Sequence, residues 1–100
     1  MSACFLLTLI VPPGLEEPLV DWLLELESAY GFSSFPVSGH SSRQEGLTLA
    51  EQVIGRKRQV RFEIALPEGE WRPLIERLRH DFAGTGIHYW VTPLLERGRA

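Results

Sequence analysis

The first apolar run of the chain is almost unbroken. Residues 3–11, "ACFLLTLIV", contain one polar side chain and end at the breakers Pro12-Pro13-Gly14. A run of this length between breakers is typical of a strand that is buried on both faces. We therefore expect a strand here, with alternate side chains pointing to opposite sides of a sheet. Phe5, Leu7, Leu9 and Val11 share one side, and Leu6 and Ile10 share the other.

Two later segments repeat their apolar residues at helical spacing. The first, residues 15–31, is preceded by the breakers and has acidic residues in its first turn, which suits the positive end of a helix. The second covers residues 70–82, and Pro73 is expected to confine its start to the residues just before it. Gly84 and Gly86 should close it. The apolar positions are Leu15, Leu19, Trp22, Leu23, Leu26 and Tyr30 in the first helix, and Trp71, Leu74, Ile75, Leu78 and Phe82 in the second.

Three further segments have the pattern of strands. In residues 59–67, "QVRFEIALP", the apolar Val60, Phe62, Ile64 and Leu66 face one way and the polar Gln59, Arg61 and Glu63 face the other. Residues 32–37 and 87–95 contain Pro36 and Pro93, which cannot donate a ladder hydrogen bond and so belong at sheet edges or bulges. The order β-α-β-β-α-β predicts a single α+β domain over residues 1–100. Its fold would be a ferredoxin-like sandwich, with a four-stranded antiparallel sheet and both helices on one face.

Two helices cover one face of such a sheet, yet the first predicted strand is apolar on both. An exposed apolar strip of this kind marks an interaction surface or an aggregation hazard. In so short a chain the simplest cover is another copy of the same chain. The sequence therefore predicts an oligomer, and Trp90 is the candidate anchor because aromatic residues are enriched at interfaces.

Composition limits the function. The chain has 100 residues, 44% hydrophobic and 23% charged, with a net charge of -3. An acidic balance argues against general nucleic-acid binding, which needs a basic surface. The single cysteine, Cys4, cannot form an internal disulfide. The apolar start has no preceding Lys or Arg and no small-residue cleavage site, and it is too short to span a bilayer, so we expect a cytoplasmic protein without membrane insertion.

One basic cluster stands out in this acidic chain: Arg56, Lys57, Arg58 and Arg61. It fits an anion site, such as one for nucleotide phosphates, because arginine offers forked donors. It also fits a solvated strand start whose charges discourage edge pairing, and this reading is favoured because short basic runs are weak motifs. No phosphate-binding G-x-x-x-x-G-K-[ST] motif accompanies it.

The histidines raise a metal hypothesis. His40 and His88 are candidate ligands for a divalent metal, although neither lies at a local ligand spacing. If they bind no metal, His40 is simply a polar residue of a loop, and His88 is a residue of a strand pair or an interface. His80 suits the negative end of the second helix. Serines beside His40 lack an orienting carboxylate and a nucleophile elbow, so we expect no catalysis.

The whole chain resembles a known group. "LLTLIVPPGLEEPLVDWLLE", "FPVSGH", "LAEQVIGRKRQVRFEI" and "HYWVTPLLE" are similar to a small bacterial family of the PII-like superfamily, which includes the nitrogen-regulatory PII proteins and the CutA divalent-cation tolerance proteins. The biochemical role of that family is unassigned, and its members are often associated with heavy-metal efflux systems. The excursion between the second and third strands is shorter than in true PII proteins. It has no tyrosine between His40 and Arg58 for uridylylation.

The resemblance implies a homotrimer that binds a small effector in clefts between subunits. The effector would be a divalent metal or an adenine nucleotide, and the partner a membrane transporter or its regulator. The alternative is a CutA-like protein that buffers a divalent metal directly. The excursion would be the partner loop that reports effector binding, with Ser41, Arg43, Gln44, Glu45, Glu51 and Gln52 as its polar contacts.

Overall fold

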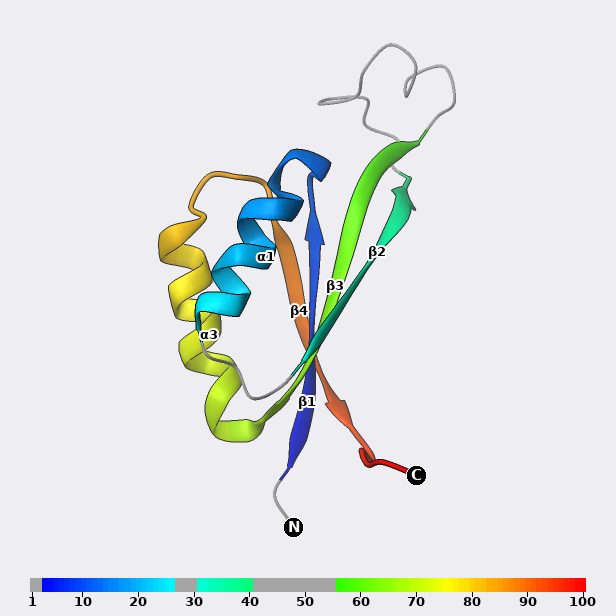
Figure 1. The fold of residues 1–100 in the computed structure, drawn as a ribbon, viewed down its shortest axis with the longest axis vertical. Helices are drawn as coiled ribbons and strands as arrows, with labels where there is room; N and C mark the ends of the chain where they lie inside the picture. Colours follow the sequence, from blue (N-terminus) through cyan, green and yellow to red (C-terminus); the bar gives the residue numbers. More distant parts are fainter. Residues whose placement is uncertain (1–2, 27–30, 41–55) are drawn as a thin grey trace.

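The predicted order of elements is confirmed. The structure, a computed structural model, describes residues 3–26, 31–40 and 56–100. The elements follow one another as two βαβ-like halves with a short 3-10 helix, η1, before the first α-helix (Figure 1). They are β1 (Cys4–Val11), η1 (Pro13–Leu15), α1 (Glu16–Glu25), β2 (Phe32–Gly39), β3 (Lys57–Pro67), α3 (Glu68–Asp81) and β4 (His88–Leu94).

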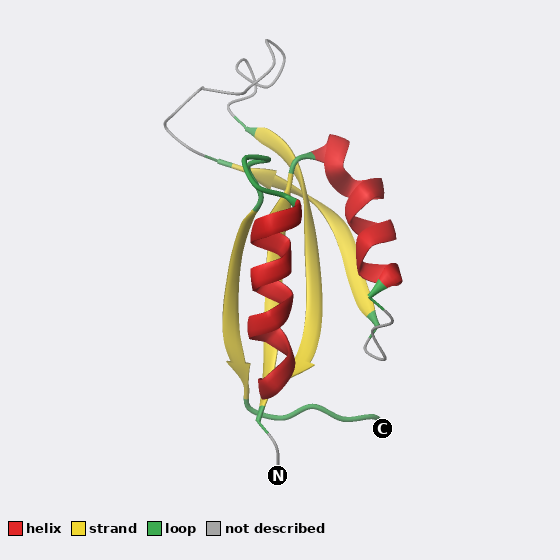
Figure 2. Cartoon of the chain, turned by 90° about the vertical axis from the view of Figure 1, so that its left-hand side faces the viewer, coloured by secondary structure: helices red, strands yellow, loops and turns green. Residues whose placement is uncertain are grey.

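The four strands form one antiparallel sheet in the order β2-β3-β1-β4. Pro36 lies in β2 and Pro93 lies in β4, and these are the two outer strands, so both prolines lie at edges as predicted. Both helices pack on the same face of the sheet (Figure 2). The expected α+β, ferredoxin-like architecture is thus confirmed.

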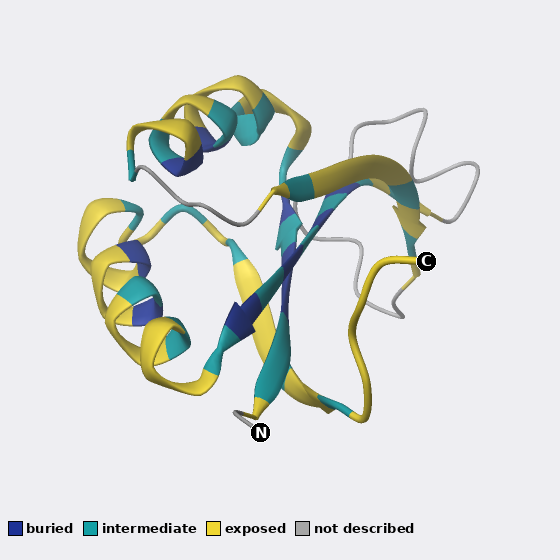
Figure 3. Ribbon diagram, turned by 60° about the horizontal axis from the view of Figure 1, so that its bottom comes forward, coloured by how far each residue is buried: buried dark blue, intermediate teal, exposed yellow. Residues whose placement is uncertain are grey.

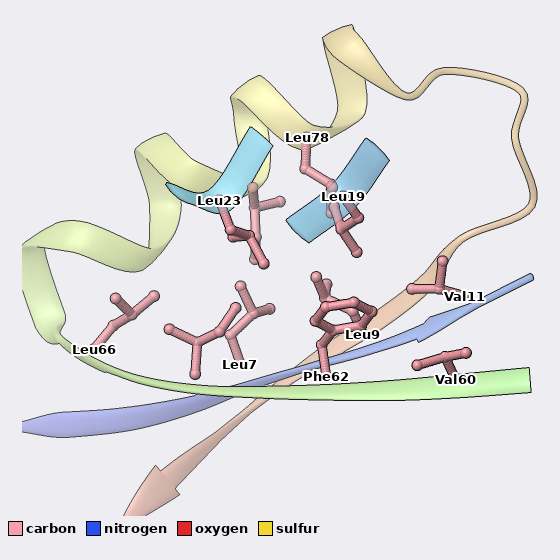
Figure 4. Close-up of a cluster of buried hydrophobic side chains, with 11 residues drawn as sticks. Leu7, Leu9, Val11, Leu19, Leu23, Val60, Phe62, Leu66 and Leu78 are labelled. Atoms are coloured by element: carbon pink, nitrogen blue, oxygen red, sulfur yellow. The ribbon is translucent and has the colours of Figure 1, made fainter. Parts of the chain in front are cut away.

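The core lies between this sheet face and the two helices. Leu7 and Leu9 of β1 lie opposite Ile64 and Phe62 of β3, and all four are at most 2% exposed. The side chains of Leu7, Leu9 and Phe62 point toward those of the helices (Figure 4). The helices contribute Leu19, Leu23, Ile75 and Leu78 to the core. Each such side chain contributes about 1.5–3 kcal/mol when fully buried. The strand periodicity of residues 59–67 and the helical spacing together predicted this core.

The buried positions of each helix face the sheet, and the outer sides are exposed (Figure 3). Tyr30, predicted on the first helix, lies outside the described residues. No described element covers the other side of the sheet, on which Leu6 and Ile10 of β1 lie. The prediction that β1 presents apolar residues to both faces is therefore confirmed.

The predicted role of Pro73 was wrong. Helix α3 begins at Glu68, and Pro73 lies inside it as the sixth residue. Proline there removes the hydrogen bond to the carbonyl four residues earlier, that of Gly69, which is exposed and accessible to water. Burial of Ile75 and Leu78 against the sheet keeps the helix continuous through that gap. Gly84 and Gly86, both at positive φ, follow its end as predicted.

Candidate functional site

The four basic residues predicted as one ligand site are divided by the pleat of β3. Arg58 is two residues before the buried Val60 and so shares the parity of the helix-covered side. Lys57 and Arg61 have the opposite parity and belong to the uncovered side. Arg56 lies exposed just before the strand. The structure therefore places Arg58 and Arg61 in different environments.

Arg58 lines a cleft at one end of the sheet. The cleft has a volume of about 380 Å³ and gathers residues from η1, the first turn of α1, the end of β2 and the start of β3. We call it the β2–β3 cleft, and it is formed by Pro13, Glu16, Pro36, Val37, Ser38, Arg58, Gln59 and Val60. The register Ser38↔Arg58 and Pro36↔Val60 brings these two strand ends side by side.

The polar groups of the cleft suit a ligand with both anionic and hydroxyl groups. Arg58 offers guanidinium donors, Ser38 offers a hydroxyl, and Glu16 offers a carboxylate acceptor. Glu16 is also the first residue of α1, so the positive end of the helix dipole lies at the cleft. Helix N-termini and arginines are recurrent anion-binding features.

Arg61 instead lies on the uncovered side of the sheet. Its guanidinium carbon lies 5.5 Å from the centroid of the Trp90 ring on β4, a cation–π distance. Its Nε lies 3.8 Å from Oε1 of Glu63. Trp90, the predicted interface anchor, lies on this side of the sheet and is 42% exposed, and its role as an anchor stays a prediction.

The two candidate metal ligands are not brought together within one chain. His40 follows the end of β2, and His88 is the first residue of β4. These are the two edge strands, three strand spacings apart, or about 14 Å. Among residues 3–26, 31–40 and 56–100, no group of three or more His, Cys, Asp and Glu side chains could hold a metal. A site that uses both histidines would have to form between chains.

The proposed partner-loop residues lie outside the described part of the chain. They are Ser41, Arg43, Gln44, Glu45, Glu51 and Gln52. The β2–β3 cleft is lined by the strand residues on either side of this segment in the sequence. The prediction that a ligand site communicates with the loop rests on the position of the cleft next to both ends of this segment.

Sequence reasoning missed a polar contact between the helices. Trp22 Nε1 of α1 donates a 2.8 Å hydrogen bond to Asp81 Oδ2 at the end of α3. The His80 ring lies 2.9 Å from Asp81 Oδ1. The hydrogen bond with His80, and then that from Trp22, hold the pKa of Asp81 below its ordinary value. His80 thus lies at the helix C-terminus as expected, but Trp22 is not only a core residue.

Comparison with known proteins identifies the family of this chain. The family described as "Protein of unknown function (DUF3240)" matches residues 1–100. The chain belongs to this family. A crystal structure of a DUF3240 family protein from Shewanella baltica has a TM-score of 0.79 and 28% sequence identity, and the match covers 100% of this chain and 99% of the other. No curated protein matches.

Two structural neighbours of this DUF3240 protein carry PII-like descriptions. One is CPII, a nitrogen regulatory PII-like protein from Thiomonas intermedia bound to ADP, AMP and bicarbonate, with a TM-score of 0.71, 21% identity, and coverage of 98% of this chain and 96% of that one. The other is a putative PII-like signaling protein from Thermus thermophilus, with a TM-score of 0.66, 19% identity, and coverage of 93% and 88%. These likenesses confirm the PII-like fold. No helix among the described residues is long and apolar enough to cross a membrane.

Proposed function

We propose that this DUF3240 protein is a PII-like regulatory protein. It assembles as a homotrimer, binds a small anionic effector of the adenine-nucleotide type at clefts between its subunits, and modulates a membrane transporter or its regulator. It acts by binding and performs no catalysis. The β2–β3 cleft, as the part of such a site that one subunit contributes, carries the proposal, because it joins an arginine and a helix N-terminus at the strand ends that flank residues 41–55.

The cleft has the size and chemistry of part of a nucleotide site. Its volume of about 380 Å³ is at the lower end of the range for small-molecule sites. Arg58 and the start of α1 suit a phosphate or another oxyanion, while the Glu16 carboxylate suits a ribose hydroxyl. CPII, whose fold is similar, is described as bound to ADP, AMP and bicarbonate, which supports the same class of effector.

The proposed output is the segment between β2 and β3. An effector changes a regulator only by binding two of its states with different affinity. A ligand that contacts Ser38 and Arg58 lies where β2 ends and β3 begins, so it favours one arrangement of the intervening chain. The proposed partner is a transporter, and heavy-metal efflux systems are the first candidates. This part of the proposal rests on the family resemblance.

The CutA-like alternative, direct buffering of a divalent metal, has less support. His40 and His88 lie on opposite edges of the sheet. A shared site would therefore need the trimer to bring them together. Titration with zinc, nickel and copper tests this directly, and tight metal binding without any nucleotide binding would favour the alternative.

The decisive experiment is calorimetric titration of the full chain with ADP and AMP. Wild type should release or absorb heat at a stoichiometry near one per subunit. Arg58→Ala should weaken ADP binding about ten- to a hundredfold, because hydrogen bonds to charged groups contribute about 1.5–3 kcal/mol. Arg77→Ala, which removes an exposed arginine from α3, is the matched control and should bind as wild type does. Absence of nucleotide binding, or a wild-type affinity in Arg58→Ala, would refute the proposal.

A further inference from the structure

The side of the sheet away from the helices, the open face, combines aromatic and charged side chains. Phe35 on β2 and Trp90 on β4 are 39% and 42% exposed, and each lies on an outer strand. Between them, β3 presents the cation Arg61 and the anion Glu63. The register places the open-face residues in two neighbouring rows: Phe35, Arg61, Ile10 and His88, then Ser33, Glu63, Thr8 and Trp90.

The charges on this face are incompletely bonded within one chain. The Arg61 and Glu63 side chains are 33% and 31% exposed, so both have lost most of their contact with water. Yet the distance of 3.8 Å between Nε and Oε1 is too long for a hydrogen bond. Arg61 Nε and Thr8 Oγ1 are buried and find no hydrogen-bond partner among the described residues. Partly desolvated charges need hydrogen bonds to offset the cost of leaving water.

The arrangement is complementary to itself. Glu63 lies one two-residue step along β3 from Arg61, a separation of about 6–7 Å. A partner of a single charge sign would pair with one of these residues and repel the other. A second copy of the face presents both signs with the same spacing, so in a closed ring of three subunits the Arg61 of each subunit can meet the Glu63 of the next. The aromatic residues on both outer strands extend the contact across the sheet.

We propose that a second copy of the chain covers the open face, and that Arg61 of one subunit donates hydrogen bonds to the partner's Glu63. Trp90 supports the Arg61 guanidinium from its own subunit at the 5.5 Å distance already present. This inference rests on the oligomeric state in the proposed function and adds the residue pair that specifies the partner.

Charge reversal tests the pairing. Arg61→Glu and Glu63→Arg should each raise the midpoint concentration for dissociation by at least about tenfold, because each places like charges together. The double variant restores opposite charges and should return the midpoint to within about threefold of wild type. Arg77→Glu and Glu76→Arg make the same charge changes on the exposed side of α3 and should leave assembly unchanged. Analytical ultracentrifugation measures the midpoints.

The outcomes separate this inference from the proposed function. A monomeric wild type would overturn the assembly itself. An oligomeric wild type whose single reversals assemble normally would overturn only the role of this pair. Loss of assembly in the single variants without recovery in the double variant would show that the two residues do not pair with each other.

A second measurement does not require the charge variants to fold. Arg61→Cys and Glu63→Cys, each in a Cys4→Ser background, carry one cysteine per chain. After the two proteins are mixed and allowed to exchange subunits, mild oxidation should join unlike chains in preference to like chains, which mass spectrometry distinguishes. Equal or absent cross-linking of unlike chains would contradict the proposed contact.

Discussion

At the scale of single residues, Asp81 is a polar connection between the two helices. It accepts a hydrogen bond from Trp22 Nε1 of α1 and lies beside the His80 ring in the last turn of α3. Trp22 also packs edge-on against Phe82, with ring centroids 5.4 Å apart. The ionised carboxylate therefore fixes the orientation of an indole that closes one end of the core.

The lowered pKa of Asp81 predicts how the Trp22 contact depends on pH. Its folded-state pKa lies below the ordinary value of 3.8, so the stabilisation is fully present above that value. It is lost as the pH falls through the folded-state pKa. Asp81→Ala should therefore lower the midpoint of thermal unfolding at neutral pH, and the difference from wild type should narrow as the pH falls below about 4.

Thermal unfolding followed by circular dichroism between pH 3 and 7 measures this difference. Asp21→Ala removes an exposed carboxylate from α1 and provides the control. If Asp81→Ala and Asp21→Ala lower the midpoint equally at every pH, the contact with Trp22 has no specific effect.

Residue environments that depend on the local pattern were predictable from the sequence, and those that depend on contacts between distant segments were not. The parity of Phe62 and Ile64 is a local property, so their burial and the outward position of Arg61 followed from the pattern. The Trp22–Asp81 bond joins residues 59 positions apart. Nothing in the local pattern of either helix indicates which polar group the other will present.

At the scale of elements, Pro73 is the clearest local conflict. It lies within α3, where it cannot donate to the carbonyl of Gly69. Pro18 differs because it is the third residue of α1, in the first turn, where backbone N–H groups have no helical acceptor. The same residue type therefore has different energetic consequences in the two helices.

Replacement of these prolines should separate the two cases. Pro73→Ala should stabilise the protein by about 1–3 kcal/mol, since the regained hydrogen bond outweighs the added freedom of the unfolded chain. Pro18→Ala should leave the free energy of unfolding unchanged or slightly lower. Urea denaturation measures both, and a gain in Pro18→Ala equal to that in Pro73→Ala would contradict the explanation.

Elements were predictable where one face of a segment is buried. The alternation of β3 and the helical spacing of α3 each depend on packing against the core, so the sequence showed the period of the apolar residues and the type of each element. The start of α3 was not, because proline propensity is a local preference and the burial of Ile75 and Leu78 overrides it. Edge positions for β2 and β4 followed from proline, which lacks a backbone donor.

At the scale of the whole molecule, the uncovered sheet face determines the expected assembly. Native mass spectrometry should find a trimer of about 34 kDa, three times the 11.3 kDa chain. Trp90→Asp should shift it to monomer, because a charge would replace an aromatic residue within a desolvated contact.

Leu24, which is 63% exposed on α1, offers the matched control. Leu24→Asp introduces the same side chain away from the sheet and should remain trimeric. Far-ultraviolet circular dichroism checks that both variants keep the wild-type fold. A Trp90→Asp protein that still assembles would exclude this face from the interface.

The candidate cleft shows why sites are harder to foresee than folds. Its lining comes from three separated stretches, near residues 13–16, 36–38 and 58–60. The cluster at residues 56–61 indicated an anion site, but the pleat sends Arg58 and Arg61 to opposite sides. Only the strand register shows that Arg58 is opposite Ser38.

The two faces of β1 expose its side chains to separate evolutionary pressures. A change at Leu7 or Leu9 alters the yield of folded chain in every cell that makes it. In the proposed assembly, a change at Leu6 or Ile10 would leave each subunit foldable and would alter which subunits recognise one another. After gene duplication, drift at these even-numbered positions could insulate two copies from each other, or allow mixed assemblies that combine two effector responses, without either copy losing its fold.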